Sequence, residues 1–452
     1  MKFVKKIKRK IPWLSHLIVN EPVASEFSER TMVLKRNDKA NMCILCRGTK
    51  HLCGKPKCPI LLKWRNLANV LSVLDTDNVE GLSPPDIFVG RIGYPNVFAG
   101  PLVPPGIRED TSYLGTPELW VGKTIDDIVR MRTVLLRGVS RINARAPSRA
   151  GRFYEKIVEM VLSKRPVDTT IYVKKVLGGL LLDDQMQPMG PIVSVRDMTI
   201  EVRGTDHAIE KVYSDDDLKA YDAMLELYRR GVLVSKIIRC LSAGLLGKIS
   251  ERRLVPTRWS ITAVDSILSM WLRDNLVKQN PVIGEYRVHE FSNLGDKFIV
   301  ILFPHVWSYE LIEAWFPGTL WNPWNDFVGI AGDWETYHGR EGYASIGGCY
   351  YAARLAVSEF LAREGKQAAV LILRESYPEH ILPVGVWHVR ESVRAALKQK
   401  PVIFNNLRET LDYVFSRLKI SSDIWMKTSS LLRFILRQRK LDDYLKHSST
   451  MR

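Results

Sequence analysis

The sequence predicts an α+β protein: a mixed α/β body between a short cysteine-rich segment and a flexible C-terminal peptide. Four of the six cysteines fall between residues 43 and 58, amphipathic and continuously apolar segments alternate through the middle, and the last residues are polar and cationic. Such alternation is typical of packed layers of helices and sheets. We divide the chain into five parts: a basic arm (1–38), the cysteine-rich segment (39–62), a mixed helix/strand region (63–285), an α/β region (286–436) and a tail (437–452).

The cysteine-rich segment offers four thiolates at the spacing C-x2-C-x6-C-x4-C, from Cys43, Cys46, Cys53 and Cys58. Four thiolates in a tetrahedron are typical of structural Zn²⁺, which supplies on the order of 10 kcal/mol to folding. Disulfides are disfavoured because nothing marks the chain as secreted, and a redox pair needs only C-x-x-C. An iron–sulfur cluster, or His51 in place of one thiolate, remains an alternative. We predict structural zinc with no open position for catalysis.

The formal net charge of +17 favours polyanionic partners, either nucleic acid or anionic lipid. No stretch approaches the roughly 20 apolar residues that span a bilayer. We interpret the N-terminus as the basic arm of a cytoplasmic, nucleoid-associated protein, with a membrane-surface helix as the alternative. Basic residues around the cysteines are predicted to contact DNA phosphates. They are Arg47, Lys50, Lys55 and Lys57.

Turn residues and capping signals divide the first half of the body. Prolines and glycines across 83–116 predict short strands joined by tight turns. Thr124 is the predicted N-cap of a helix. A second helix is expected near 153–162, and a strand around 169–173.

Two amphipathic segments meet at Gly231. Ser214 and Asp217 resemble a capping box before the first of these segments. A pair of helices joined at a glycine is usually core structure, and a DNA-binding helix-turn-helix is the alternative. Thr262 is then predicted to cap a helix over 263–272.

The second half is dominated by buried strands. The continuous apolar runs "FIVILF" (298–303) and "AAVLIL" (368–373) predict strands covered on both faces of a sheet. Helices are expected near 307–315, near 350–362 and across 405–440. No internal repeat interrupts this order.

The tail contains the pattern Q-x-x-L-x-x-aromatic-apolar, which resembles the PIP box that binds the sliding clamp (PCNA). In one helical turn, residues at i, i+3 and i+4 converge into a single apolar plug, and the glutamine amide can enter a polar pocket. Leu445 stands where an aromatic residue is usual. The alternative is an ordinary helix end packed on the core. The predicted clamp contacts are Gln438, Leu441, Tyr444 and Leu445.

Catalysis is left open by the sequence. A nuclease would hold Mg²⁺ with clustered carboxylates, for which the candidates are Asp326, Asp333 and Glu335, with His338 nearby. A nucleotide or ADP-ribose-type ligand would instead bind at the glycines before the helix near 350, with contacts from Arg258, Ser260 and Ser345. The same residues equally fit solvated charges beside a capped helix.

Taken together, several segments resemble the archaeal Nre family of DNA-repair proteins nearly end to end. They are the cysteine cluster, "FVGRIGYPNVFAGPLVPP" (88–105), "KRPVDTTIYV" (164–173), "LSAGLLG" (241–247), "RRLVPTRWSITAVDSI" (252–267) and the tail. The resemblance implies a role in DNA-damage repair, a four-cysteine zinc site and association with the clamp. It brings no catalytic assignment.

Overall fold

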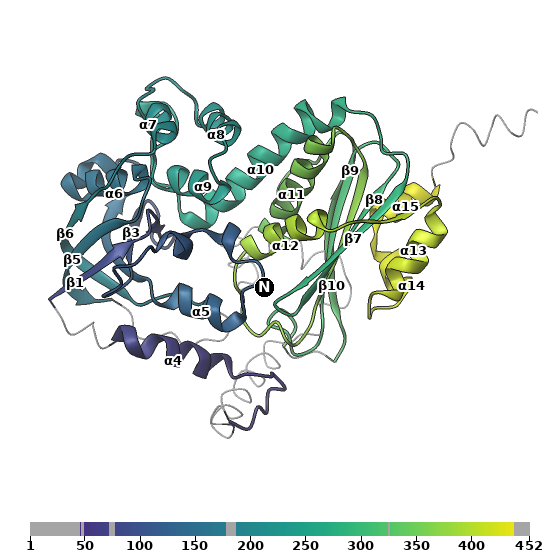
Figure 1. The fold of residues 1–452 in the computed structure, drawn as a ribbon, viewed down its shortest axis with the longest axis horizontal. Helices are drawn as coiled ribbons and strands as arrows, with labels where there is room; N and C mark the ends of the chain where they lie inside the picture. Colours follow the sequence, from purple (N-terminus) through teal and green to yellow (C-terminus); the bar gives the residue numbers. More distant parts are fainter. Residues whose placement is uncertain (1–45, 47–48, 72–76, 178–186, 324–325, 438–452) are drawn as a thin grey trace, which may run out of the picture.

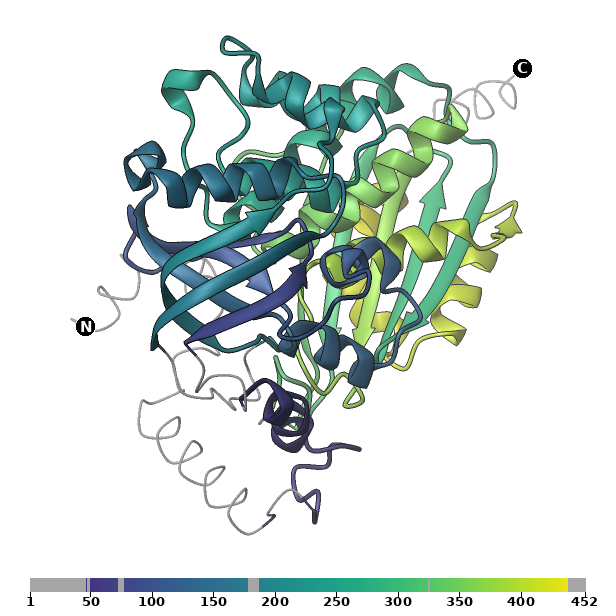
Figure 2. The same ribbon diagram turned by 60° about the vertical axis from the view of Figure 1, so that its left-hand side comes forward.

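The computed structural model describes residues 46, 49–71, 77–177, 187–323 and 326–437. These residues form two halves, each built on a six-stranded mixed sheet, with long helices between the sheets (Figures 1 and 2). The mixed α/β body predicted from the sequence is therefore confirmed. Within this part of the chain, no helix combines the length and the apolar character needed to cross a membrane.

The first sheet has the order β1-β5-β6-β4-β3-β2, with only β4 and β6 parallel. Its strands are β1 (Asn78–Ser83), β2 (Ile87–Val89), β3 (Asn96–Val103), β4 (Leu136–Asn143), β5 (Val167–Val176) and β6 (Ile192–Glu201). The helices of this half are α4 (Pro59–Leu71), α5 (Ile125–Thr133), α6 (Arg152–Leu162), α7 (His207–Tyr213), α8 (Ala220–Arg229), α9 (Val234–Ser242) and α10 (Thr257–Asn275). One large apolar core joins this sheet to α6–α10.

The second sheet has the order β10-β9-β11-β8-β7-β12, with only β9 and β11 parallel. Its strands are β7 (Tyr286–Asn293), β8 (Asp296–Phe303), β9 (Ser308–Trp315), β10 (Gly329–Glu335), β11 (Ala369–Ser376) and β12 (Val402–Phe404). Its helices are α11 (Gly348–Glu364), α12 (Trp387–Lys398), α13 (Leu407–Ser416), α14 (Ser422–Thr428) and α15 (Ser430–Arg437). Helices α11 and α12 cover one face and α13–α15 the other (Figure 1), with a separate apolar core on each side.

Short 3₁₀ helices connect several of these elements, at Ser112–Gly115, Pro117–Leu119, Pro147–Ala150, Ile249–Glu251 and Val277–Gln279.

Several local predictions are confirmed. Thr124 caps α5, and its hydroxyl accepts a hydrogen bond from the Asp127 N–H while the Asp127 side chain accepts from the Thr124 N–H. The predicted short strands, the helix near 153–162 and the strand at 169–173 correspond to β2 and β3, α6 and β5. Both apolar runs are buried strands, β8 and β11.

The helix predicted near 307–315 is wrong, because this segment is strand β9. Glu310 and Glu313 gave it a helix-like spacing of charges, yet both are buried. Glu310 accepts hydrogen bonds from the backbone N–H groups of Ser430 (2.8 Å) and Leu431 (3.0 Å) at the start of α15. Glu313 pairs with Arg374 of β11. Charges in a strand can be buried when distant partners neutralise them.

Two predicted caps are also wrong. Before α8, Asp215 Oδ1 accepts from the N–H groups of Asp217 (3.2 Å) and Leu218 (3.0 Å), so no box forms with Ser214. Thr262 lies inside α10, which begins at Thr257. Most of α9 is buried, which fits paired core helices and leaves little exposed face for the helix-turn-helix alternative.

Candidate functional site

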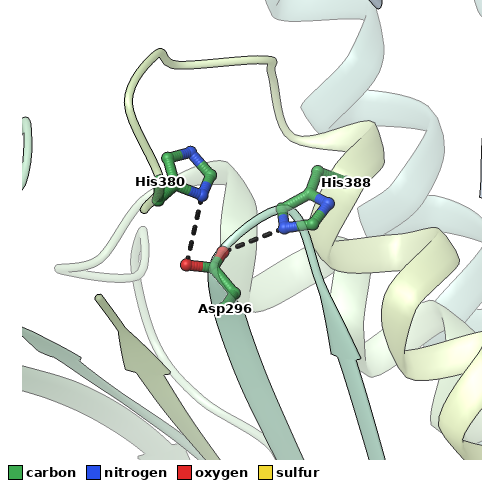
Figure 3. A group of neighbouring side chains, drawn as sticks. All are labelled: Asp296, His380 and His388. Atoms are coloured by element: carbon green, nitrogen blue, oxygen red, sulfur yellow. Dashed lines mark hydrogen bonds and ion pairs between the residues drawn. The ribbon is translucent and has the colours of Figure 1, made fainter. Parts of the chain in front are cut away.

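A buried polar cluster lies where β9 and β11 end at the same edge of the second sheet. Ligands of α/β proteins commonly bind at the carboxyl ends of parallel strands. Asp296 begins the antiparallel neighbour β8 and is paired in register with Ser376, the last residue of β11. Arg374 precedes it on β11, His380 follows in the loop, and His388 lies in the first turn of α12. Elements far apart in the chain therefore converge here (Figure 3).

Asp296 is the centre of the cluster and is 1% exposed. Its Oδ2 accepts hydrogen bonds from Arg374 Nη2 (2.6 Å) and Arg374 Nε (2.9 Å), and lies 2.9 Å from His388 Nε2. Its Oδ1 accepts from the Ser376 hydroxyl. Burial alone would raise the pKa of Asp296, but the charge of Arg374 and the contacts with the histidines hold it well below its usual range.

His388 is neutral at pH 7. Its burial lowers the pKa to about 4, although the contact with Asp296 acts in the opposite direction. The second ring nitrogen, Nδ1, lies 3.4 Å from the Ser392 hydroxyl. A neutral imidazole held between two such groups is fixed in orientation.

His380 differs because its Nε2 has no hydrogen-bond partner among the described residues, although the side chain is buried. Its Nδ1 lies 3.1 Å from Asp296 Oδ1 (Figure 3), and its ring centroid lies 5.1 Å from that of Trp321, which is 44% exposed. The turn between β7 and β8 packs closely against the loop that carries His380. A Cβ on Gly295 in this turn would lie 2.3 Å from the backbone nitrogen of His380. His380 is thus a buried titratable group beneath a partly exposed ring.

The donor set raises the question of a metal ion. Asp296, His380 and His388 form the only group in the described part of the chain whose three ligand atoms lie within 4.8 Å of one another. The Arg374 guanidinium already lies against the same carboxylate. A divalent cation at this point would be repelled by that charge. The cluster therefore fits proton exchange at a histidine better than metal binding.

Glu335, a predicted magnesium ligand, is buried and bonded to the fold. It accepts from Arg354 Nη1 (2.6 Å), Arg273 Nη1 (3.0 Å), Trp307 Nε1 (3.1 Å) and the Tyr350 hydroxyl (3.1 Å). Burial would raise its pKa, but Arg354 and Arg273 lower it overall. Both carboxylate oxygens are therefore occupied by protein donors.

The other candidate ligands lie apart from one another. Asp333 accepts from the Ser345 N–H (2.6 Å) and pairs with Arg340 (2.8 Å), so the structure brings Asp333 and Ser345 together. Asp326 and His338 are exposed. In the described part of the chain, none of the four predicted metal-binding or acid–base residues joins a three-ligand group.

The two remaining ligand candidates lie at the start of α10. Ser260 is fully buried, and its hydroxyl lies 3.4 Å from the Val255 carbonyl. Arg258 is exposed. The Ser345 hydroxyl, like that of Ser260, contacts a backbone carbonyl: it donates to Gly332 at 3.2 Å. Both serine hydroxyls are therefore engaged by backbone in this structure.

The cysteine-rich segment is described only in part, since Cys43 and Arg47 lie outside the described residues. Cys46 is buried, Cys53 exposed and Cys58 of intermediate exposure. Leu62, which follows in α4, packs in a small core with Ile381 and Leu382 of the loop that carries His380. The segment is thus attached to the second half of the protein.

The basic residues of this segment differ in exposure. Lys50 is exposed, and Lys57 is exposed but pairs with Asp126 at 2.6 Å. Lys55 is 6% exposed, and its Nζ lies 3.5 Å from the Ile381 carbonyl. Lys55 therefore faces protein and is poorly placed for a DNA phosphate. The predicted clamp contacts, Gln438, Leu441, Tyr444 and Leu445, lie outside the described residues.

Sequence analysis missed Asp296, Arg374, His380 and His388. One signal was present: "RES" follows the apolar run at 368–373 directly, and polar residues at the end of a buried parallel strand often line a site. The two histidines carry no such pattern.

Comparison with known proteins shows the family to which this chain is similar. The family model described as "Archaeal Nre, N-terminal" matches residues 52–322, and the one described as "Archaeal Nre, C-terminal" matches residues 335–444. The DNA repair proteins NreB and NreA of Archaeoglobus fulgidus are each 38% identical, over 89% and 83% of this chain and 100% and 94% of their own lengths. NreA of Haloferax volcanii is 40% identical over 71% of this chain and 79% of its own length. No solved structure matches.

These matches define an archaeal protein in which two regions are joined in one chain. The chain belongs to the archaeal Nre family. The gap between the two matched regions, 323–334, contains nearly all of β10. The first region supplies β7, β8 and β9 to the second sheet, and the second region supplies β11 and β12. The cluster likewise takes Asp296 from the first region and Arg374, His380 and His388 from the second.

Proposed function

We propose that this chain is a DNA repair protein that binds DNA and is recruited to its site of action by the sliding clamp. The observation that carries the proposal is the match to a relative named as a DNA repair protein along that relative's whole length. The net charge of +17 supports contact with a polyanion and a place at the nucleoid.

Recruitment is assigned to Gln438, Leu441, Tyr444 and Leu445, which follow α15 directly. In one helical turn the three apolar residues would form a single plug that fits an apolar pocket of the clamp. Recruitment of this kind raises the local concentration of the protein on DNA without requiring sequence-specific contacts.

Structural zinc at Cys43, Cys46, Cys53 and Cys58 is the second part of the proposal. The spacing supplies a complete set of thiolates. Zinc would fix the segment before α4 and so secure its packing against Ile381 and Leu382. Lys50 and Lys57 on this segment remain candidate phosphate contacts, whereas Lys55 is buried.

Deletion of the gene in the native archaeon tests the repair role. The deletion strain is expected to lose survival after DNA damage, and the intact gene should restore it. Leu441→Ala with Tyr444→Ala should restore it only in part. Normal survival of the deletion strain under alkylating, crosslinking and ultraviolet damage contradicts the proposal.

A second candidate function is catalysis at the Asp296 cluster, and it is favoured by Nε2 of buried His380, which has no hydrogen-bond partner among the described residues. An acid or base at this position could serve either a nuclease or an enzyme that acts on a nucleotide-type ligand. A catalytic role predicts that His380→Asn abolishes complementation while clamp binding, DNA binding and thermal stability stay intact. Full complementation by this variant removes the candidate.

A further inference from the structure

Three loops of the first half meet at one edge of the first sheet. They are the turn 90–95 between β2 and β3, the turn 144–146 after β4, and the segment 252–256 before α10. The Ala144 N–H donates to the Pro95 carbonyl (2.7 Å), and the Leu254 N–H donates to the Ala144 carbonyl (2.9 Å). These bonds fix side chains from three parts of the sequence on one surface.

Two aromatic rings lie on this surface. The centroids of Tyr94 and Trp259 are 5.3 Å apart with an interplanar angle of 52°. Trp259 is 46% exposed although it stands at the start of a long helix, and Ile92 at the tip of the first turn is 87% exposed. Exposed apolar groups that gather on one surface often mark a binding site.

Arginines lie near these rings or next to them in the sequence. The Arg145 guanidinium lies 6.0 Å from the Tyr94 ring centroid, and a Cβ on Gly93 would lie 3.8 Å from Arg141 Nη2. Arg91 and Arg258 are exposed and adjacent in sequence to Ile92 and Trp259.

Among the residues that the structure describes, these four arginines have no carboxylate partner. Of the ion pairs formed within the described chain, none involves Arg91, Arg141, Arg145 or Arg258. Arg273, Arg354 and Arg390 are by contrast all neutralised by buried carboxylates. The surface therefore keeps its positive charge, and the N-terminal end of α10 adds to it.

We propose that this arginine–aromatic surface (Arg91, Tyr94, Arg141, Arg145, Arg258 and Trp259) binds single-stranded or unpaired DNA. The exposed Trp259 ring, with the partly buried Tyr94 ring beside it, offers a face on which a base stacks, and the nearby guanidiniums take the phosphates. In an intact duplex the base faces are covered by their neighbours, so Trp259 can stack only where bases are unpaired. The inference rests on the proposed function and specifies the DNA structure that the protein recognises.

Fluorescence anisotropy with the full chain tests stacking, with labelled oligothymidine and a duplex of equal length as probes. Trp259→Ala is expected to weaken single-strand binding roughly tenfold or more, and duplex binding much less. Trp259→Phe keeps a ring and should stay within about threefold of the wild type. The melting temperature of each variant separates loss of binding from loss of folding.

The phosphate contacts are tested by the salt dependence of single-strand binding. The triple variant Arg91→Ala, Arg141→Ala, Arg258→Ala should flatten the slope of log affinity against log salt by about 2, since each phosphate contact contributes roughly 0.7. A matched control removes equal charge elsewhere: Lys398, Lys400 and Arg408, all exposed and in the second half of the protein, are changed to Ala. The control should leave the slope nearly unchanged.

The outcomes separate the two proposals. If the wild type binds neither probe, direct DNA binding fails and this surface fails with it. If the wild type binds DNA but both Trp259→Ala and the triple variant bind like the control, the DNA interface lies elsewhere and only the present inference is overturned. Equal losses on duplex and single strand contradict the stacking role of Trp259.

Discussion

His388 Nε2 lies 2.9 Å from Asp296 Oδ2 inside the protein, and both residues are 1% exposed. The aspartate starts β8 and the histidine stands in the first turn of α12, so the contact joins the two family regions. Because Arg374 holds the same oxygen, the carboxylate is charged and fully bonded. The stability of the second sheet should therefore depend on the protonation of His388 and Asp296.

Acid should destabilise the protein through His388. Its pKa of about 4 in the folded protein is below the ordinary value of 6.5, so the unfolded chain takes up the proton first as the pH falls below 6.5. The free energy of unfolding should fall by on the order of 3 kcal/mol between pH 6.5 and 4 from this residue. The lowered pKa of Asp296 acts in the same direction below about pH 4.

Urea unfolding at pH 7 and pH 4.5 measures this effect in the wild type and in His388→Gln, which cannot take up the proton. The variant is expected to show the smaller loss of stability on acidification. Equal losses in the two proteins would mean that His388 does not control the acid response.

Glu335→Gln should destabilise the fold. The change removes the charge that neutralises Arg273 and Arg354 in the interior. Breaking a buried pair in this way costs about 3 to 5 kcal/mol. Denaturant unfolding measures the cost, and Glu341→Gln, an exposed residue nearby, is the control. An unchanged stability together with a lost affinity for Mg²⁺ would instead support the metal-ligand role.

Zinc should be present at one ion per chain in the purified protein. Cys53→Ser and Cys58→Ser are each expected to lose the metal and to lower the melting temperature, because binding energy at such a site is folding energy. Cys240→Ala is the matched control, since this cysteine is buried in the main core away from the segment. Elemental analysis decides the point, and iron with visible absorbance would indicate the cluster alternative.

Leu441→Ala combined with Tyr444→Ala should abolish co-elution with the sliding clamp. Loss of two central apolar anchors typically costs more than about 2 kcal/mol, or roughly thirtyfold in affinity. Asp442→Ala with Lys446→Ala changes one variable position of the motif and the residue that follows the motif, and should bind normally. Retention of the first variant on the clamp would show that the tail is not the contact.

The sequence was most informative where the signal is local or continuous. The capping box joins Thr124 to Asp127, only three positions further along the chain. Strands β8 and β11 each contain an uninterrupted apolar run. Strand β9 was misassigned because Glu310 and Glu313 are neutralised by α15 and β11, which the local pattern does not contain. The periodicity of a sequence does not show which charged residues are buried with a distant partner.

The candidate site was not predicted for the same reason. Arg374 and His388 reach Asp296 across 78 and 92 residues of sequence. The register of β8 with β11 brings Arg374 to Asp296, and α12 brings His388. The arginine–aromatic surface was predicted only in part, since the segments that hold Arg91 and Arg258 were singled out separately. Their proximity depends on the hydrogen bonds that join Pro95, Ala144 and Leu254.

The most direct test of the account is the affinity of the intact wild-type protein for gapped DNA over a series of salt concentrations. Direct binding through four unpaired arginines predicts a log–log slope of about −3. It also predicts tighter binding to the gapped DNA than to the sealed duplex. Absence of binding, or an affinity that does not change with salt, would contradict the claim that this protein acts directly on DNA.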